Sequence, residues 1–100
     1  MLVIYKTPSD TAAFDKHYFE RHVPLAKQLP GLRKYEVSRG PINALAGGEA
    51  YMVAELHFDD LAAIRAAFAS EVGKACAADR QIFAPDPTAF QMLLFEDRAV

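Results

Sequence analysis

Apolar side chains recur at helical spacing in the first third of the chain, with one polar ring among them. The stripe consists of Phe14, Tyr18, His22, Leu25 and Leu29, at i, i+4, i+8, i+11 and i+15. Residues at these spacings share one face of an α-helix, and an apolar face is the one that packs on a core. The pattern therefore predicts a helix that runs to about Gln28 and carries the imidazole of His22 on its buried side.

Single residues predict the ends of this helix and an irregularity within it. Ser9 or Asp10 can cap its N-terminus by accepting a hydrogen bond from a free backbone N–H. Pro24 lacks an N–H and clashes with the carbonyl four residues earlier, so we expect a kink or a fresh first turn there. The Leu-Pro-Gly sequence at residues 29–31 ends the helix, because glycine can adopt positive φ.

Four short stretches rich in β-branched and aromatic residues predict β-strands. They cover residues 2–6, 32–39, 50–58 and 89–95. The second strand alternates, with Tyr35 and Val37 on one face, and the third places Leu56 opposite Glu55 and His57. If Leu56 faces the helices, Glu55 and His57 point into a barrel or its rim, where they must be hydrogen-bonded. We assign that pair to an interface network, with catalysis as the alternative.

A second helical region lies between the third and fourth strands. Apolar residues recur at i, i+3 and i+7 from Leu61, and Asp59 or Asp60 can cap the helix. Ser70 interrupts it and can cap a further helical piece, which two prolines at positions 85 and 87 end. The complete order of elements is βαββαβ.

This order predicts an α+β fold of the ferredoxin-like type. Such a fold has a four-stranded antiparallel sheet with both helices on one face. The other face is normally polar, but the first and fourth strands are apolar on both faces. We therefore expect a second copy to cover that face, sheet against sheet, as a dimeric α+β barrel. The alternative is that these residues are ordinary apolar positions at the rim of the sheet.

Size and charge narrow the classes of function. The 100 residues are expected to form a single domain, 1–100, around one core. The 11 basic and 13 acidic residues give a net charge of -2 and form no basic stripe, so nucleic-acid binding is not expected. Cys76 has no second cysteine to pair with, and no segment has the pattern of a signal peptide or a membrane span. We expect a cytoplasmic protein.

His22 is the first candidate catalytic residue, because imidazole titrates near neutral pH. Apolar neighbours disfavour its charged form and lower its pKa, which keeps the ring neutral and able to accept a proton. Tyr35, on the strand face assigned to the helices, can donate a hydrogen bond to a carbonyl or enolate oxygen. The alternatives are a structural histidine that binds carbonyls freed by Pro24, and a core tyrosine whose hydroxyl reaches solvent.

Other polar side chains are assigned to structure. His17 lies five residues before His22, so the two rings do not share an α-helical face, and without a third clustered ligand no metal site is expected. Asp79 is assigned to the surface or to a hydrogen bond between the last helix and a loop. Cys76 is assigned to packing among alanines. Tyr18 is assigned chiefly to packing, although it can line the same cavity as His22.

Several short motifs resemble the signature of the EthD family, named for ethyl tert-butyl ether degradation. They are Phe14-Asp15, Tyr18, His22-Val23-Pro24-Leu25, Leu29-Pro30-Gly31-Leu32 and Tyr35, with Ala78-Asp79, Phe83 and the closing apolar strand in the second half. The resemblance covers nearly the whole chain and implies a small dimeric α+β barrel. The wider superfamily includes muconolactone isomerases, polyketide cyclases and cofactor-free monooxygenases.

Individual residues resemble some members of this superfamily more than others. The methylmuconolactone isomerases pair a helix histidine with a strand tyrosine, which His22 and Tyr35 match. The Asn and Trp residues of the monooxygenases have no match, and this chain has no Trp. A role as a quinone-forming oxygenase is therefore not implied.

Two functions follow from the residues and the resemblance. The first is a small cofactor-independent catabolic enzyme, isomerase-like, cyclase-like or associated with an oxidoreductase. It transfers a proton within a small apolar oxygenated compound through His22, with Tyr35 as hydrogen-bond donor. The expected pocket lining is Phe14, Tyr18, Phe68 and Phe83. The second is a non-catalytic accessory dimer that binds hydrophobic ligands alongside an oxygenase system, with His22 structural. Haem binding through a histidine, as in related barrels, is a third hypothesis.

Overall fold

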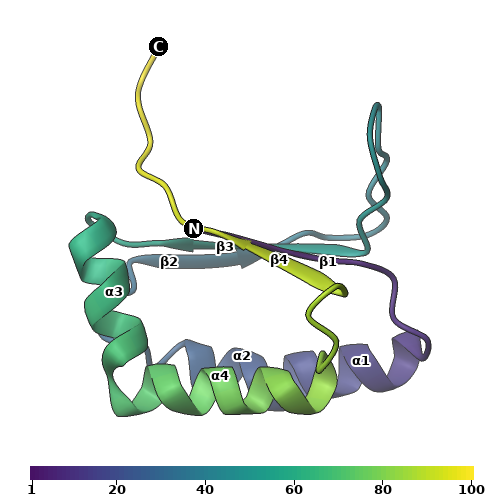
Figure 1. Cartoon of the computed structure of the whole chain (residues 1–100), viewed down its shortest axis with the longest axis horizontal. Coiled ribbons are helices and arrows are strands. Elements are labelled where there is room, and N and C mark those ends of the chain that lie inside the picture. Colours follow the sequence, from purple (N-terminus) through teal and green to yellow (C-terminus); the bar gives the residue numbers. More distant parts are fainter.

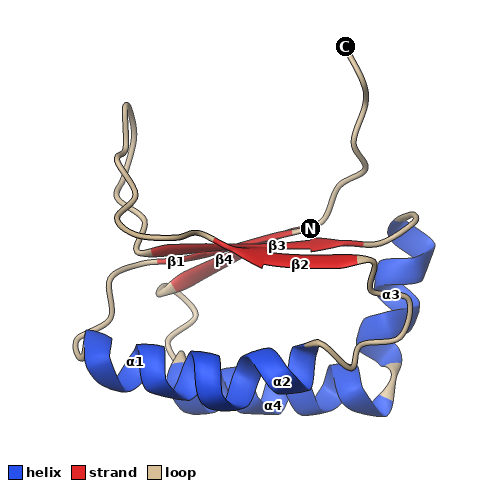
Figure 2. Ribbon diagram, turned by 180° about the vertical axis from the view of Figure 1, so that it is seen from behind, coloured by secondary structure: helices blue, strands red, loops and turns tan.

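A computed structural model describes all 100 residues of the chain. Its elements are β1 (Leu2–Tyr5), α1 (Thr11–His17), η1 (Tyr18–His22), α2 (Val23–Ala26), β2 (Lys34–Val37), β3 (Met52–His57), α3 (Leu61–Ala69), α4 (Glu71–Phe83) and β4 (Phe90–Leu93). The strands form one antiparallel sheet in the order β2-β3-β1-β4. The helices lie against one face of this sheet (Figures 1 and 2). The predicted ferredoxin-like α+β fold is confirmed, with a sheet that does not close on itself.

The helices begin where short polar side chains were predicted to cap them. Asp10 accepts from the backbone N–H of Ala13 at 3.0 Å, and Asp60 accepts from that of Ala63 at 2.8 Å. Ser70 ends α3 and caps α4, because its hydroxyl accepts from the backbone N–H of Gly73 at 3.1 Å. Each cap satisfies a backbone donor that the first helical turn leaves free.

The first helical region is not one continuous α-helix. Between α1 and α2 the turn η1 is a π-helix, in which the backbone N–H of Val23 bonds to the carbonyl of Tyr18, five residues earlier. Pro24 follows directly, near the start of α2. It has no N–H for the carbonyl of Glu20 and its ring crowds that carbonyl, so the preceding turn widens. The predicted irregularity is therefore a whole wide turn placed before the proline.

This wide turn shifts the buried stripe by one position. Tyr18 and His22 are buried as predicted, but the next buried residue is Ala26, while Leu25 is half-buried. A wide turn uses more residues than an α-helical one, so the buried position of the following turn moves from Leu25 to Ala26. Leu29, which lies beyond the end of α2, is buried as predicted, at 4% exposure.

The sheet turns its large apolar side chains toward the helices. Val3 lies opposite Ala54 on β3 and Met92 on β4, and Tyr35 lies opposite Leu56. All the strands are shorter than predicted. The central strand β1 offers only four residues, so β4 pairs with it only from Phe90 to Leu93.

The opposite face of the sheet has no helix over it (Figure 2). It presents Leu2, Ile4, Val53 and Leu93, together with Glu55, His57, Lys34 and Glu36. Residues 38–51 and residues 94–100 both project from the sheet to the side away from the helices (Figure 1). None of the helices has both the length and the apolar character needed to cross a membrane.

Candidate active site

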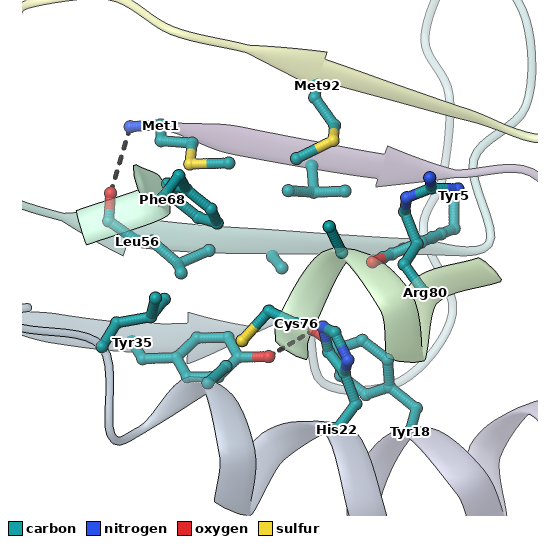
Figure 3. Close-up of a pocket in the computed structure, with 15 residues that line it drawn as sticks. Met1, Tyr5, Tyr18, His22, Tyr35, Leu56, Phe68, Cys76, Arg80 and Met92 are labelled. Atoms are coloured by element: carbon teal, nitrogen blue, oxygen red, sulfur yellow. Dashed lines mark hydrogen bonds between the residues drawn. The ribbon is translucent and has the colours of Figure 1, made fainter. Parts of the chain in front are cut away.

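A cavity of about 160 Å³ lies between the sheet and the helix layer. Its aliphatic and sulfur-containing lining comes from most of the elements and consists of Met1, Val3, Ala26, Leu29, Ala54, Leu56, Cys76, Ala77 and Met92, joined by Phe68. The polar groups on its wall belong to Tyr5, Tyr18, His22, Tyr35 and Arg80 (Figure 3). An apolar cavity of about 150 Å³ is large enough for benzene, so this one suits a guest of similar size.

His22 is the buried polar side chain of this wall, at 9% exposure. Its Nδ1 lies 2.8 Å from Oδ2 of Asp79 on α4. Burial lowers the pKa of His22 below its ordinary value, although the hydrogen bond to Asp79 acts in the opposite direction. The ring is therefore neutral at pH 7. Since an ionised carboxylate can only accept, Nδ1 carries the proton and Nε2 keeps its lone pair.

The lone pair on Nε2 of His22 is free for a guest. Nε2 has no hydrogen-bond partner in the chain. Every side-chain nitrogen or oxygen that is fully buried in this structure does have such a partner, so Nε2 is not fully buried. Nε2 is therefore accessible, and the residue lines the cavity. This arrangement gives a neutral imidazole that is oriented by a carboxylate and open to accept a proton on its other side.

Asp79 bonds to two histidines at once. Its Oδ1 lies 2.8 Å from Nε2 of His17, while Oδ2 holds His22. Burial raises the pKa of Asp79, but the hydrogen bonds from both rings outweigh that effect and hold the pKa below its usual range. The carboxylate is thus ionised, which favours a proton on Nδ1 of His22.

The π-helical turn is what brings His17 and His22 to the same carboxylate. In an α-helix, residues five apart are rotated by about 140° from alignment, since each residue turns about 100°. A π-helical turn, closed by an i to i+5 hydrogen bond, holds more residues, so residues five apart come closer to the same face. The prediction that the two histidines do not share a face was therefore wrong, because it assumed α-helical geometry through residue 22.

Two phenol hydroxyls form the second polar group of the cavity. The hydroxyl oxygens of Tyr18 and Tyr35 are 2.6 Å apart. Burial raises the pKa of Tyr18, and burial likewise raises the pKa of Tyr35 to about 12, so both keep their protons at neutral pH. One hydroxyl donates to the other, and the accepting hydroxyl keeps a proton that it can donate elsewhere. The rings of Tyr18 and His22 are adjacent, with centroids 5.3 Å apart.

The cavity contains some, but not all, of the predicted lining. His22, Tyr35, Tyr18 and Phe68 lie on its wall. Phe14 and Phe83 lie behind it. Phe14 stacks on Tyr18 with ring centroids 5.9 Å apart, and Phe83 packs edge-on against the ring of His22 at 4.7 Å. Both phenylalanines pack against the rings of the polar residues without lining the open space.

Sequence reasoning missed Asp79, Tyr5 and Arg80 as members of the site. Tyr5 shares a strand face with Val3, and Arg80 follows Asp79 on α4, so a strand-face count could have found Tyr5. Glu55 and His57 do not approach this cavity, because they lie on the uncovered face of the sheet. No group of three or more His, Cys, Asp or Glu side chains is arranged to hold a metal ion.

Comparison with known proteins gives consistent matches. Residues 6–87 match the family model described as the EthD domain. The chain is 40% identical over 84 residues to an uncharacterized 11.0 kDa protein in the thcB-thcC intergenic region of Rhodococcus erythropolis, a match that covers 82% of this chain and 80% of the relative. A crystal structure of an ethyl tert-butyl ether d (EthD) family protein from Bacillus halodurans has a TM-score of 0.85 and 31% sequence identity, over 97% of this chain and 95% of that one.

Proposed function

The chain belongs to the EthD family, and from this premise we propose that it binds a small, largely apolar oxygenated molecule and transfers a proton within it without a cofactor. The observation that supports this proposal is the neutral His22, oriented by Asp79, beside the Tyr18–Tyr35 hydroxyl pair in one apolar cavity. Enolisation requires a base that removes the proton and a hydrogen-bond donor that stabilises the enolate oxygen, and both groups face the same cavity.

In the proposed reaction, Nε2 of His22 removes a proton from a carbon next to the carbonyl of the guest. The imidazolium that forms stays paired with the ionised Asp79, and the electron pair of the broken C–H bond moves onto the carbonyl oxygen as an enolate. We assign Tyr18 as the donor of the hydrogen bond between the two hydroxyls, so that Tyr35 donates its own proton in a hydrogen bond to that oxygen. His22 then returns a proton to the enolate. Return to the same carbon gives hydrogen exchange, and transfer to another carbon completes an isomerisation.

The size of the cavity supports this class of guest. An open space of about 160 Å³ holds few heavy atoms, and its lining is mostly hydrophobic. The family is named for ethyl tert-butyl ether, a small branched apolar molecule with one oxygen. We therefore propose a catabolic role on small branched carbonyl compounds of similar size, isomerase-like or in association with an oxidoreductase, and a cytoplasmic location that fits the unpaired buried Cys76.

Deuterium exchange into small carbonyl compounds tests the proposal. Cyclopentanone, butanone and γ-butyrolactone are incubated in D₂O with wild-type protein, and loss of the α-proton signals is followed by NMR. We expect wild-type protein to exchange the α-protons faster than buffer alone. In His22→Gln the protein-dependent exchange rate should be lower by about a hundredfold or more. The matched control is His57→Gln on the uncovered face, which should retain the wild-type rate. Exchange that is unchanged in His22→Gln would contradict the proposal.

The alternative is a non-catalytic accessory dimer that binds hydrophobic ligands. One observation favours it. The hydrogen bonds of Asp79 to His17 and His22 join η1 to α4, so His22 has a structural role that needs no catalysis. Binding of cyclopentanone, measured by chemical-shift changes, without any exchange above buffer would favour this alternative.

We also propose that two copies pair through the uncovered faces of their sheets. Leu2, Ile4, Val53 and Leu93 would lie at the centre of that contact, with Leu93 at 37% exposure in the single chain. Apolar side chains on a face without a helix are what a symmetric interface buries.

A further inference from the structure

Tyr5 has a buried hydroxyl with no partner in the protein. The residue is 3% exposed, on the central strand β1, and its ring packs edge-on against Phe14 and Tyr18. No hydrogen bond within the chain involves its hydroxyl oxygen. That oxygen nevertheless keeps some accessible surface, and the residue lines the cavity. Figure 3 shows this oxygen directed into the cavity. A buried hydroxyl without a partner costs free energy unless something in the cavity pairs with it.

Arg80 brings a positive charge to the same end of the cavity. Its guanidinium carbon lies 4.2 Å from the centroid of the Phe90 ring, and one of its N–H groups donates to the carbonyl of Ala84 at 2.9 Å. These two contacts fix the side chain but leave its other N–H donors free. Arg80 forms no ion pair with a carboxylate of the chain.

The two ends of the cavity therefore differ in chemistry. Figure 3 shows Tyr5 and Arg80 together at one end, with Tyr35 toward the other and His22 between them. At the first end both polar side chains have a free donor, and the Arg80 guanidinium is cationic. Donors that converge beside an unpaired guanidinium match an oxygen that carries negative charge, because charge-assisted hydrogen bonds are the strong ones.

We propose that Tyr5 and Arg80 form an anion subsite, which binds a carboxylate of the guest while its enolisable carbon lies against His22. This inference rests on the proposed function and narrows its substrate class to small carbonyl or lactone acids. Arg80 binds the carboxylate with N–H groups that Ala84 does not use, and Tyr5 donates its hydroxyl proton to the same group. The charge of the guest then replaces the counter-ion that the chain does not supply.

A pair of isosteric probes tests the subsite. Isobutyrate and isobutyramide have the same number of heavy atoms and differ in charge, and their binding is measured by NMR titration of the wild-type protein. We expect isobutyrate to bind at least about tenfold more tightly, which is the effect of one charged hydrogen bond. In Arg80→Met this preference should disappear while the affinity for isobutyramide changes less than about twofold.

Two further variants keep the test decisive. Tyr5→Phe removes only the hydroxyl and should weaken isobutyrate several-fold, so it serves if Arg80→Met does not fold. Lys74→Met removes the same charge from an exposed position on α4 and should leave both affinities unchanged. Equal binding of the two probes to wild type, or a preference that survives in both Arg80→Met and Tyr5→Phe, would overturn the subsite alone. Failure of both probes to bind would overturn both the subsite and the proposed cavity function.

Discussion

At the scale of single residues, His22 is governed by two opposing influences on its pKa. Burial lowers the pKa, and Asp79 partly restores it, with a net value below 6.5. A general base is active when it is neutral, so proton abstraction should be lost as pH falls through this lowered pKa and should be constant above it.

We therefore expect the deuterium-exchange rate to rise with pH and to reach half of its maximum below pH 6.5. The measurement is the NMR exchange rate of cyclopentanone between pH 4.5 and 8, corrected for the buffer reaction at each pH. A rate that continues to rise above pH 7 would indicate a different base.

Replacement of Asp79 by Asn separates orientation from charge. Asn can still accept from Nδ1, but it removes the negative charge that raises the pKa of His22 and stabilises the imidazolium. In Asp79→Asn we expect a maximal exchange rate lower by about tenfold or more and an acid limb shifted to lower pH.

The shift of the acid limb is the decisive part, because a purely structural role of Asp79 would not move it. Asp59→Asn is the control, since Asp59 is exposed and pairs only with Arg33 at the surface. Its pH profile should match that of wild type.

The candidate site was predictable only where a residue lies on a local pattern. His22 interrupts an apolar stripe and Tyr35 lies on an alternating strand, so both could be found from sequence neighbours. Asp79 is 57 residues from His22 and meets it only after η1 and α4 pack together. No local spacing encodes that contact, which is why Asp79 was assigned to the surface or a loop.

At the scale of elements, the π-helical turn sets which side chains meet the carboxylate. Pro24 was expected to disturb the helix, and it does. The form of the disturbance was not predictable, because a kink, a new turn and a wide turn all relieve the same clash with the carbonyl of Glu20.

Restoration of the missing N–H should narrow this turn. In Pro24→Ala we expect α-helical hydrogen bonds through residue 24, rotation of His17 away from Asp79, and a change in unfolding free energy of less than about 2 kcal/mol. The measurement is the ¹H–¹⁵N spectrum of the imidazoles, in which the signal of the His17 proton bonded to Asp79 should disappear. Retention of that signal would show that the wide turn does not depend on the proline.

The contact between α3 and α4 depends on a glycine. A Cβ atom at Gly73 would lie 2.5 Å from Cα of Phe68 and still closer to the carbonyl oxygen of Ala67, both of which are backbone and cannot yield easily. Gly73→Ala should therefore destabilise the fold by about 1–3 kcal/mol and displace Phe68 at the cavity wall. Chemical denaturation measures this change, and Lys74→Ala, exposed on the same helix, should change the free energy of unfolding by no more than about 0.5 kcal/mol.

At the scale of the whole molecule, the βαββαβ order and the antiparallel sheet were predictable because each element has its own periodicity and cap. The apolar positions on both faces of β1 and β4 led to the proposed pairing of two copies. A single charged side chain on that face tests it.

Leu93→Lys places a charge on the uncovered face of β4, where it would be buried by a second sheet. We expect wild-type protein to have the mass of a dimer by light scattering and Leu93→Lys to have that of a monomer. Ile82→Lys is the control, because Ile82 is 69% exposed on α4 and lies outside the proposed contact. A monomeric wild type would exclude the pairing.

Cys76 is a free cysteine on the cavity wall, so the reactivity of its thiol reports whether the cavity is occupied. Burial raises the pKa of this thiol, so alkylation by a small reagent such as iodoacetamide proceeds slowly and only through the open space beside it. Any compound that fills the space slows the labelling in proportion to its affinity. A library of metabolites can thus be ranked by mass spectrometry of this one adduct, without an assay of turnover.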